Sequence, residues 1–209
     1  MAARKVQAVR ERRDALMLLV KIEPRAALRM TAELAKELKS AVRDYVEAGG
    51  KNVTDGEMAM LRRDAKDARE AADEALNRLP AEPEEAGIAG GEAGGGAAPA
   101  IVDAEMKRAR LAYAAAFEVA DTWDERADRA EALLGVAVAD RGFFQQVKEA
   151  IAELKEAREK IRADWSHPKA PDRNDWKEAD KEMAELEKAI DMAPAGTPDL
   201  ASTGASVQA

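Results

Sequence analysis

Apolar residues recur at alternating spacings of four and three between residues 102 and 137, which predicts one long amphipathic helix. The eleven positions of this seam are all apolar: Val102, Met106, Ala109, Tyr113, Ala116, Ala120, Trp123, Ala127, Ala130, Leu134 and Ala137. Further apolar side chains flank the seam at Phe117, Val119, Leu133 and Val138, so its face is too broad for a single partner helix. We therefore expect a central bundle helix over 102–140 that contacts at least two other helices.

The hydrophobic period changes phase near residue 142. If the seam continued unchanged, Arg141 and Lys148 would lie in the core, whereas a shifted seam from Phe144 to Trp165 is almost entirely apolar. Because the change of phase coincides with Gly142, the sequence predicts a turn there. A second helix would then run back over 143–165.

The last predicted helix covers residues 174–192, with an apolar seam of its own. Either Asp172 or Asn174 could cap its first turn, since both side chains accept hydrogen bonds from backbone N–H groups. The loop before it carries two prolines, which interrupt helical geometry.

Three helices are predicted before the glycine-rich segment, over 3–22, 24–48 and 54–79. Proline at position 24 can end the first of these or open the second. Two glycines at 49–50 end the second helix, and Thr54 with Glu57 forms a capping box for the third.

The domain boundaries follow from composition. Residues 80–100 hold six glycines, three prolines and a single large apolar side chain, which is typical of a flexible acidic linker. This predicts an N-terminal helical unit over 1–79 and a C-terminal helical unit over 101–192. The remainder, 193–209, lacks periodicity and is predicted to be disordered.

Composition narrows the fold class further. Charged residues make up 35% of the chain and aromatic residues only 4%, which favours long solvated helices over a sheet. Together with the periodicity, this predicts an all-α fold of about six helices, either a helical bundle or a coiled-coil-like assembly. No run of apolar residues is long enough to cross a bilayer, so no membrane partner is expected.

The residues that usually carry catalysis are sparse. Cysteine is absent, and the one histidine, His167, lies in a predicted loop. There is no nucleophile triad, phosphate-binding loop or cluster of His and Cys ligands, and regularly spaced glutamates among lysines indicate a solvated helix face. We therefore predict a protein that is not an enzyme and that uses no metal or cofactor.

Basic residues concentrate at two places in the N-terminal unit. The candidates for contact with nucleic acid are Arg10, Arg12, Arg13, Arg62 and Arg63. The first three are spread around their predicted helix and are not aligned on one stripe, and the net charge of the chain is −8. A nucleic-acid-associated protein with an oligomerising C-terminal unit is therefore the alternative hypothesis.

The strongest candidate surface lies at the start of the central seam. With a turn at Gly142, neither later helix reaches far enough to cover it, and an apolar stripe should not stand in water. We call Val102, Met106, Ala109, Tyr113 and Phe117 the apolar stripe. Its cover is either the N-terminal helices folding back across the linker, another copy of the chain or a different protein, and we predict an intermolecular partner because a flexible acidic linker is a poor way to enforce docking within the chain. The sequence thus favours a cytoplasmic structural protein: an adaptor, a scaffold or a subunit of a larger complex such as a phage particle.

Overall fold

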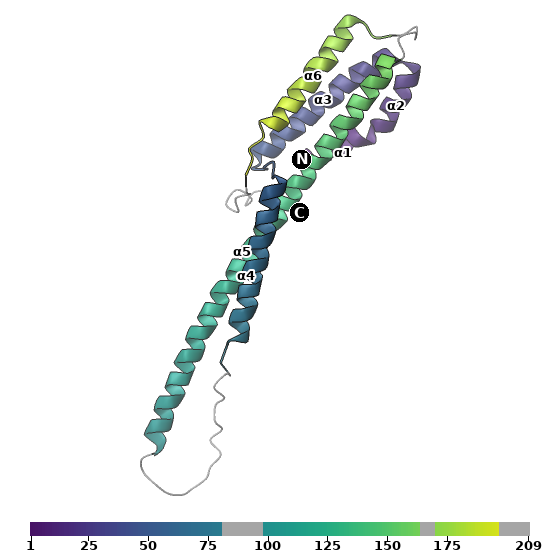
Figure 1. The fold of residues 1–209 in the computed structure, drawn as a ribbon. Helices are drawn as coiled ribbons and strands as arrows, with labels where there is room; N and C mark the ends of the chain where they lie inside the picture. Colours follow the sequence, from purple (N-terminus) through teal and green to yellow (C-terminus); the bar gives the residue numbers. More distant parts are fainter. Residues whose placement is uncertain (81–97, 164–169, 197–209) are drawn as a thin grey trace. The chain divides into compact units, whose positions relative to one another are not determined.

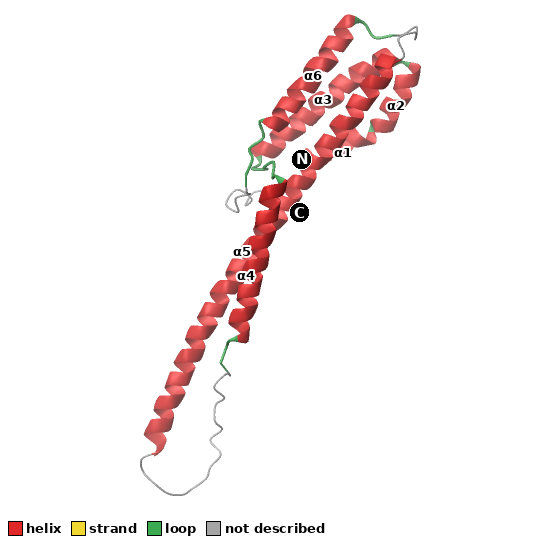
Figure 2. Cartoon of the chain, in the orientation of Figure 1, coloured by secondary structure: helices red, strands yellow, loops and turns green. Residues whose placement is uncertain are grey.

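The computed structural model describes residues 1–80, 98–163 and 170–196, with the backbone alone for 98–105. The fold is all-α, as predicted (Figure 2). The helices are α1 (Ala2–Glu11), α2 (Arg13–Ile22), α3 (Pro24–Glu47), α4 (Asp55–Asn77), α5 (Ala98–Ala163) and α6 (Arg173–Asp191). Within these ranges there is no β-strand, and one isolated parallel bridge joins Asn52 to Ala195.

The chain forms two compact units that interleave along the sequence. The first unit contains residues 1–58 and 135–209, and the second contains residues 59–134. Helix α5 runs without interruption through both, so its two ends belong to different units.

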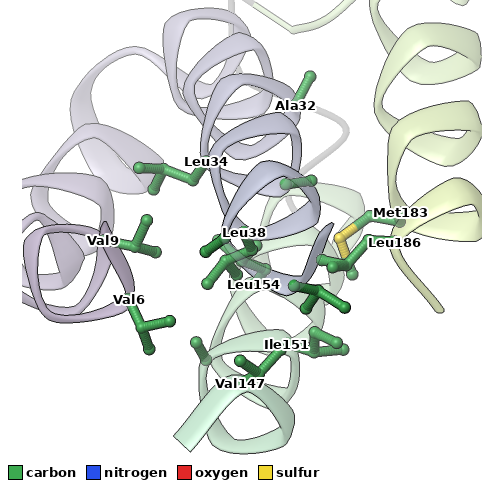
Figure 3. Close-up of a cluster of buried hydrophobic side chains, with 14 of the residues drawn as sticks. Val6, Val9, Ala32, Leu34, Leu38, Val147, Ile151, Leu154, Met183 and Leu186 are labelled. Atoms are coloured by element: carbon green, nitrogen blue, oxygen red, sulfur yellow. The ribbon is translucent and has the colours of Figure 1, made fainter. Parts of the chain in front are cut away.

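The core of the first unit surrounds α3. Figure 3 shows Val6 and Val9 of α1, Leu34 and Leu38 of α3, Val147, Ile151 and Leu154 of α5, and Met183 and Leu186 of α6 gathered in this core. In α3 the buried residues recur at helical spacing on more than one side, which lets a single helix contact several neighbours. Alanines at 27, 32, 35 and 41 are buried as well, and small side chains allow helices to approach closely.

Ion pairs join α3 to α6 alongside this core. Lys36 Nζ lies 2.9 Å from Glu178, and Lys39 Nζ lies 2.8 Å from Glu182 and 2.5 Å from Glu185. At the start of α6, Asp172 is the capping residue and accepts from the backbone N–H groups of residues 174 and 175. The sequence left this cap open between Asp172 and Asn174, and the structure selects Asp172.

Acid should weaken this helix pair. The Lys36 ammonium lowers the pKa of Glu178, the Lys39 ammonium lowers that of Glu185, and backbone N–H donors lower the pKa of Asp172. Depressed pKa values stabilise the fold above the ordinary values of 4.5 for Glu and 3.8 for Asp, and this stabilisation disappears as pH falls through the lowered values. We expect the urea midpoint of the first unit to fall progressively below about pH 4.5.

The control for acid sensitivity uses two exposed lysines. Lys36→Gln should reduce the fall in urea midpoint, because Glu178 loses its partner, whereas Lys21→Gln should leave it unchanged. A midpoint that stays constant down to about pH 3 would contradict the role of these pairs.

A tight junction follows α3 in the first unit. Gly49 ends the helix with a φ of 93°, and a Cβ on Gly50 would come within 2.2 Å of the Tyr45 ring. The Tyr45 hydroxyl donates to Asp140, which is only 3% exposed, over 2.7 Å, and the backbone N–H of Lys51 donates to the same carboxylate over 3.1 Å. Burial and the nearby carboxylate raise the pKa of Tyr45 well above its usual value. The junction therefore holds α5 against the end of α3 through satisfied polar groups.

The predicted turn at Gly142 is wrong. Gly142 lies inside α5, and the phase of the seam changes because the helix changes partners. The residues of α5 up to 134 belong to the second unit, whereas Phe144, Val147 and Leu154 of the same helix face the core of the first unit. One continuous helix presents a different side to each set of neighbours, and this produces the same sequence pattern as a turn.

The predicted division into units 1–79 and 101–192 also differs from the structure. Helices α1, α2 and α3 share their core with residues 143–193 instead of forming a unit of their own. The first predicted helix, over 3–22, is divided at Arg12, where no glycine or proline marks a break. Arg12 N donates to Val9 O, and its guanidinium pairs with Glu37 of α3 at 2.7 Å, so contacts with α3 accompany this break.

Two further predictions fall largely outside the described residues. The linker is predicted over 80–100, of which 81–97 lie outside, and α5 already begins at Ala98. Of the predicted tail, residues 197–209 lie outside, but its first residues are ordered: Ala193 is buried, and Pro194 O accepts from Asn52 N over 2.9 Å. The start of the predicted tail is therefore part of the first unit, where it is held by the backbone hydrogen bond from Asn52.

Candidate functional site

The second unit is an antiparallel pair formed by α4 and the first half of α5 (Figure 1). Small side chains form its core: Ala68 and Ala72 of α4 and Ala127 of α5, with Trp123 and Ala130 packed against them. Arg69 lies 3.1 Å from Asp124 and 3.8 Å from Asp128, and these pairs hold the register. Because alanine removes little apolar surface from water, this core is modest.

The apolar stripe lies on α5 toward the end that begins at Ala98. Burial on the seam is complete at Ala120 and Ala127, but Met106 and Tyr113 are only half-buried and Ala109 is exposed. In Figure 1, α5 extends past the end of α4 within this unit. Val102 belongs to the same helix, but its side chain lies outside the described residues.

Aromatic side chains dominate the exposed part of the stripe. The rings of Tyr113 and Phe117 stack with centroids 6.3 Å apart and an interplanar angle of 24°. Phe117 remains 52% exposed. Stacked aromatic rings at a helix surface offer a large and rigid apolar contact, which suits binding of another helix.

One exposed apolar residue was not predicted by the seam. Leu111 is 71% exposed and lies on a different side of α5 from Met106 and Tyr113. A search for heptad positions passes over it, because it lies two residues before Tyr113. What marks Leu111 in the sequence is its place in an uncharged stretch of α5 that has basic residues before it and acidic residues after it.

The predicted nucleic-acid residues do not form one surface in the first unit. Arg12 pairs with Glu37 of α3 at 2.7 Å, whereas Arg10 and Arg13 pair with Glu149 and Glu153 of α5 at 3.4 and 3.6 Å. Their charges are therefore balanced by carboxylates of the same unit.

The other two candidate arginines, Arg62 and Arg63, are exposed on α4 in the second unit. Neither forms an ion pair with another residue that the structure describes. They stand next to Asp64 and near Asp67, so this part of α4 is of mixed charge.

The described residues form neither a metal-binding cluster nor a membrane-spanning helix. In residues 1–80, 98–163 and 170–196, no group of three or more His, Cys, Asp or Glu residues could hold a metal ion. His167 lies outside those ranges. None of the helices in the described part of the chain is both long and apolar enough to span a membrane.

Comparison with protein-family models, with curated proteins and with solved structures finds no match.

Proposed function

We propose that this protein is a non-enzymatic assembly protein, an adaptor or scaffold-like subunit, that binds a helical protein partner on the apolar stripe of α5. The observation that carries the proposal is the exposure of this stripe beyond the point where α4 covers the seam. Half-buried Met106 and Tyr113 and exposed Phe117 continue the same helical face whose later positions, Ala120 and Ala127, are buried. A partner helix would extend the existing packing in the direction already set by α4.

The chemistry of the stripe favours a protein partner over nucleic acid. Its side chains are apolar or aromatic, whereas phosphate contacts require a row of basic groups. The basic residues Arg10, Arg12 and Arg13 already pair with carboxylates of the first unit. Binding to nucleic acid is the alternative hypothesis, and nuclease treatment tests it in the same experiment as the proposal.

The direct test places charge on the stripe. Met106→Asp combined with Tyr113→Asp should abolish recovery of a discrete protein partner from the source cells, because a buried carboxylate without a partner costs several kcal/mol. Recovery is measured by affinity purification and mass spectrometry, with and without nuclease. The circular dichroism of the variant should remain close to that of the original chain.

A matched control separates a specific effect from a general effect of charge. Thr122→Asp combined with Ala132→Asp adds the same charge at exposed positions of the same helix and should leave recovery unchanged. The proposed function is wrong if the stripe variant retains its partner. It is also wrong if nuclease treatment releases the partner from the original chain and from the control variant.

A further inference from the structure

Charge is segregated along α5 around a short neutral stretch. Residues 106–110 contain three basic side chains and no acidic one, whereas residues 118–131 contain six acidic and two basic side chains. The seven residues between them, 111–117, carry no charge. A helix of this kind is positive at one end of its neutral stretch and negative at the other.

Four of these charges are arranged symmetrically about Ala114. Lys107 and Asp121 each lie seven residues from it, on opposite sides, and Arg110 and Glu118 each lie four residues from it. The large apolar residues Leu111 and Phe117 are each three residues away. Every basic residue of this set therefore has an acidic counterpart at the same distance in the other direction.

These residues also share one side of the helix. At about 100° per residue, all seven fall within roughly a third of the circumference, centred on Ala114. This side lies about 100° around the helix from the part of the apolar stripe formed by Met106, Ala109 and Tyr113. All seven are exposed, and Leu111 and Phe117 are 71% and 52% exposed.

We infer that a second copy of this chain docks antiparallel on this face of α5, with Ala114 of both copies at a two-fold axis. In a two-fold interface, residue i of one copy meets residue j of the other, and j meets i. Lys107 then opposes Asp121 of the second copy, Arg110 opposes Glu118, and Leu111 packs against Phe117. Each of these contacts occurs twice.

The charges on this face disfavour a parallel dimer. In a parallel pair in register, Lys107 would face Lys107 and Asp121 would face Asp121, so like charges would repel. The paired span from Lys107 to Asp121 is about 21 Å long, or roughly four turns. Because this contact is short, the dimer should dissociate on dilution and weaken as salt is raised.

Charge reversal in the full chain tests the inference. One variant carries Lys107→Glu with Arg110→Glu, and the other carries Glu118→Lys with Asp121→Lys. Each variant alone should dimerise at least about tenfold more weakly than the original chain, because four attractive contacts become repulsive. An equimolar mixture should regain the dimer, since the two variants are complementary. Sedimentation equilibrium over a concentration series measures all three samples.

Three results would overturn the inference: an original chain that stays monomeric at about 1 mM, reversed variants that dimerise like the original, or a mixture that does not recover. Recovery in the mixture also shows that both variants are folded. Met106→Asp with Tyr113→Asp lies on another side of the helix and should leave the dimer intact. If that variant loses the dimer and the charge variants keep it, the copies meet on the apolar stripe, which contradicts this inference but not the proposed function.

Discussion

Replacement of Leu154 by alanine should lower the free energy of unfolding of the first unit by about 2–5 kcal/mol. Leu154 is 2% exposed and packs among side chains of α1, α3 and α6. Its truncation would leave a cavity between helices that meet from distant parts of the chain, so the surroundings could not easily collapse around it. Urea denaturation followed by circular dichroism and by the fluorescence of Trp176 measures the loss.

Leu111 of the same helix is the matched control. Leu111→Ala removes the same atoms from a side chain that is 71% exposed, so the free energy of unfolding should change by no more than about 0.5 kcal/mol at low protein concentration. Equal effects of the two substitutions would contradict the burial of Leu154 in a common core.

Separation of the chain into fragments 1–79 and 98–209 should unfold the first unit. Its core combines residues 2–46 with residues 143–193, so each fragment would expose most of the apolar surface that the other covers. The core holds six buried leucines, and each would lose about 1.5–3 kcal/mol on exposure, so their combined loss is comparable with the usual stability of about 5–15 kcal/mol for a folded domain. Neither fragment alone should show a cooperative thermal transition by circular dichroism, whereas an equimolar mixture should regain one.

A variant fragment controls for non-specific association. Leu38 of α3 is fully buried, and Leu38→Asp in fragment 1–79 should prevent recovery in the mixture. A cooperative transition in isolated fragment 1–79 would show that the N-terminal helices form a unit by themselves, which would contradict the shared core.

The phase change near residue 142 has two possible structural causes, a turn of the chain or an exchange of neighbours along one helix. The seams on both sides of it are helical, as predicted, and the shifted seam is buried at Phe144, Val147, Ile151, Leu154 and Ile161. A pattern of apolar residues records which side of a helix is covered, but it does not record what covers it. A turn and an exchange of neighbours therefore give the same pattern, and only the packing of Phe144 and Val147 with α1, α3 and α6 distinguishes them.

The apolar stripe was located by sequence for a partly different reason. The prediction assumed that two returning helices would leave Met106 and Tyr113 uncovered, whereas the helix that packs on the seam is α4, which covers it at Trp123, Ala127 and Ala130. Ala109 and Phe117 are exposed and Met106 and Tyr113 are half-buried, in the part of α5 that extends past the end of α4 (Figure 1). The face around Ala114 was missed, since its charges become meaningful only when Leu111 and Phe117 are known to be exposed.

The sequence by itself determined the all-α class, the start of α3 at Pro24, the cap of α4 by Thr54 and Glu57, and the long seam of α5. These features depend on contacts within a few residues, which spacing and side-chain chemistry specify directly. Only the tertiary structure decided that α5 is continuous, that α3 and α6 are paired, and that the N-terminal and C-terminal helices share one core. Those features depend on long-range packing among similar amphipathic helices, and the choice is made by which apolar faces and charges fit together in three dimensions.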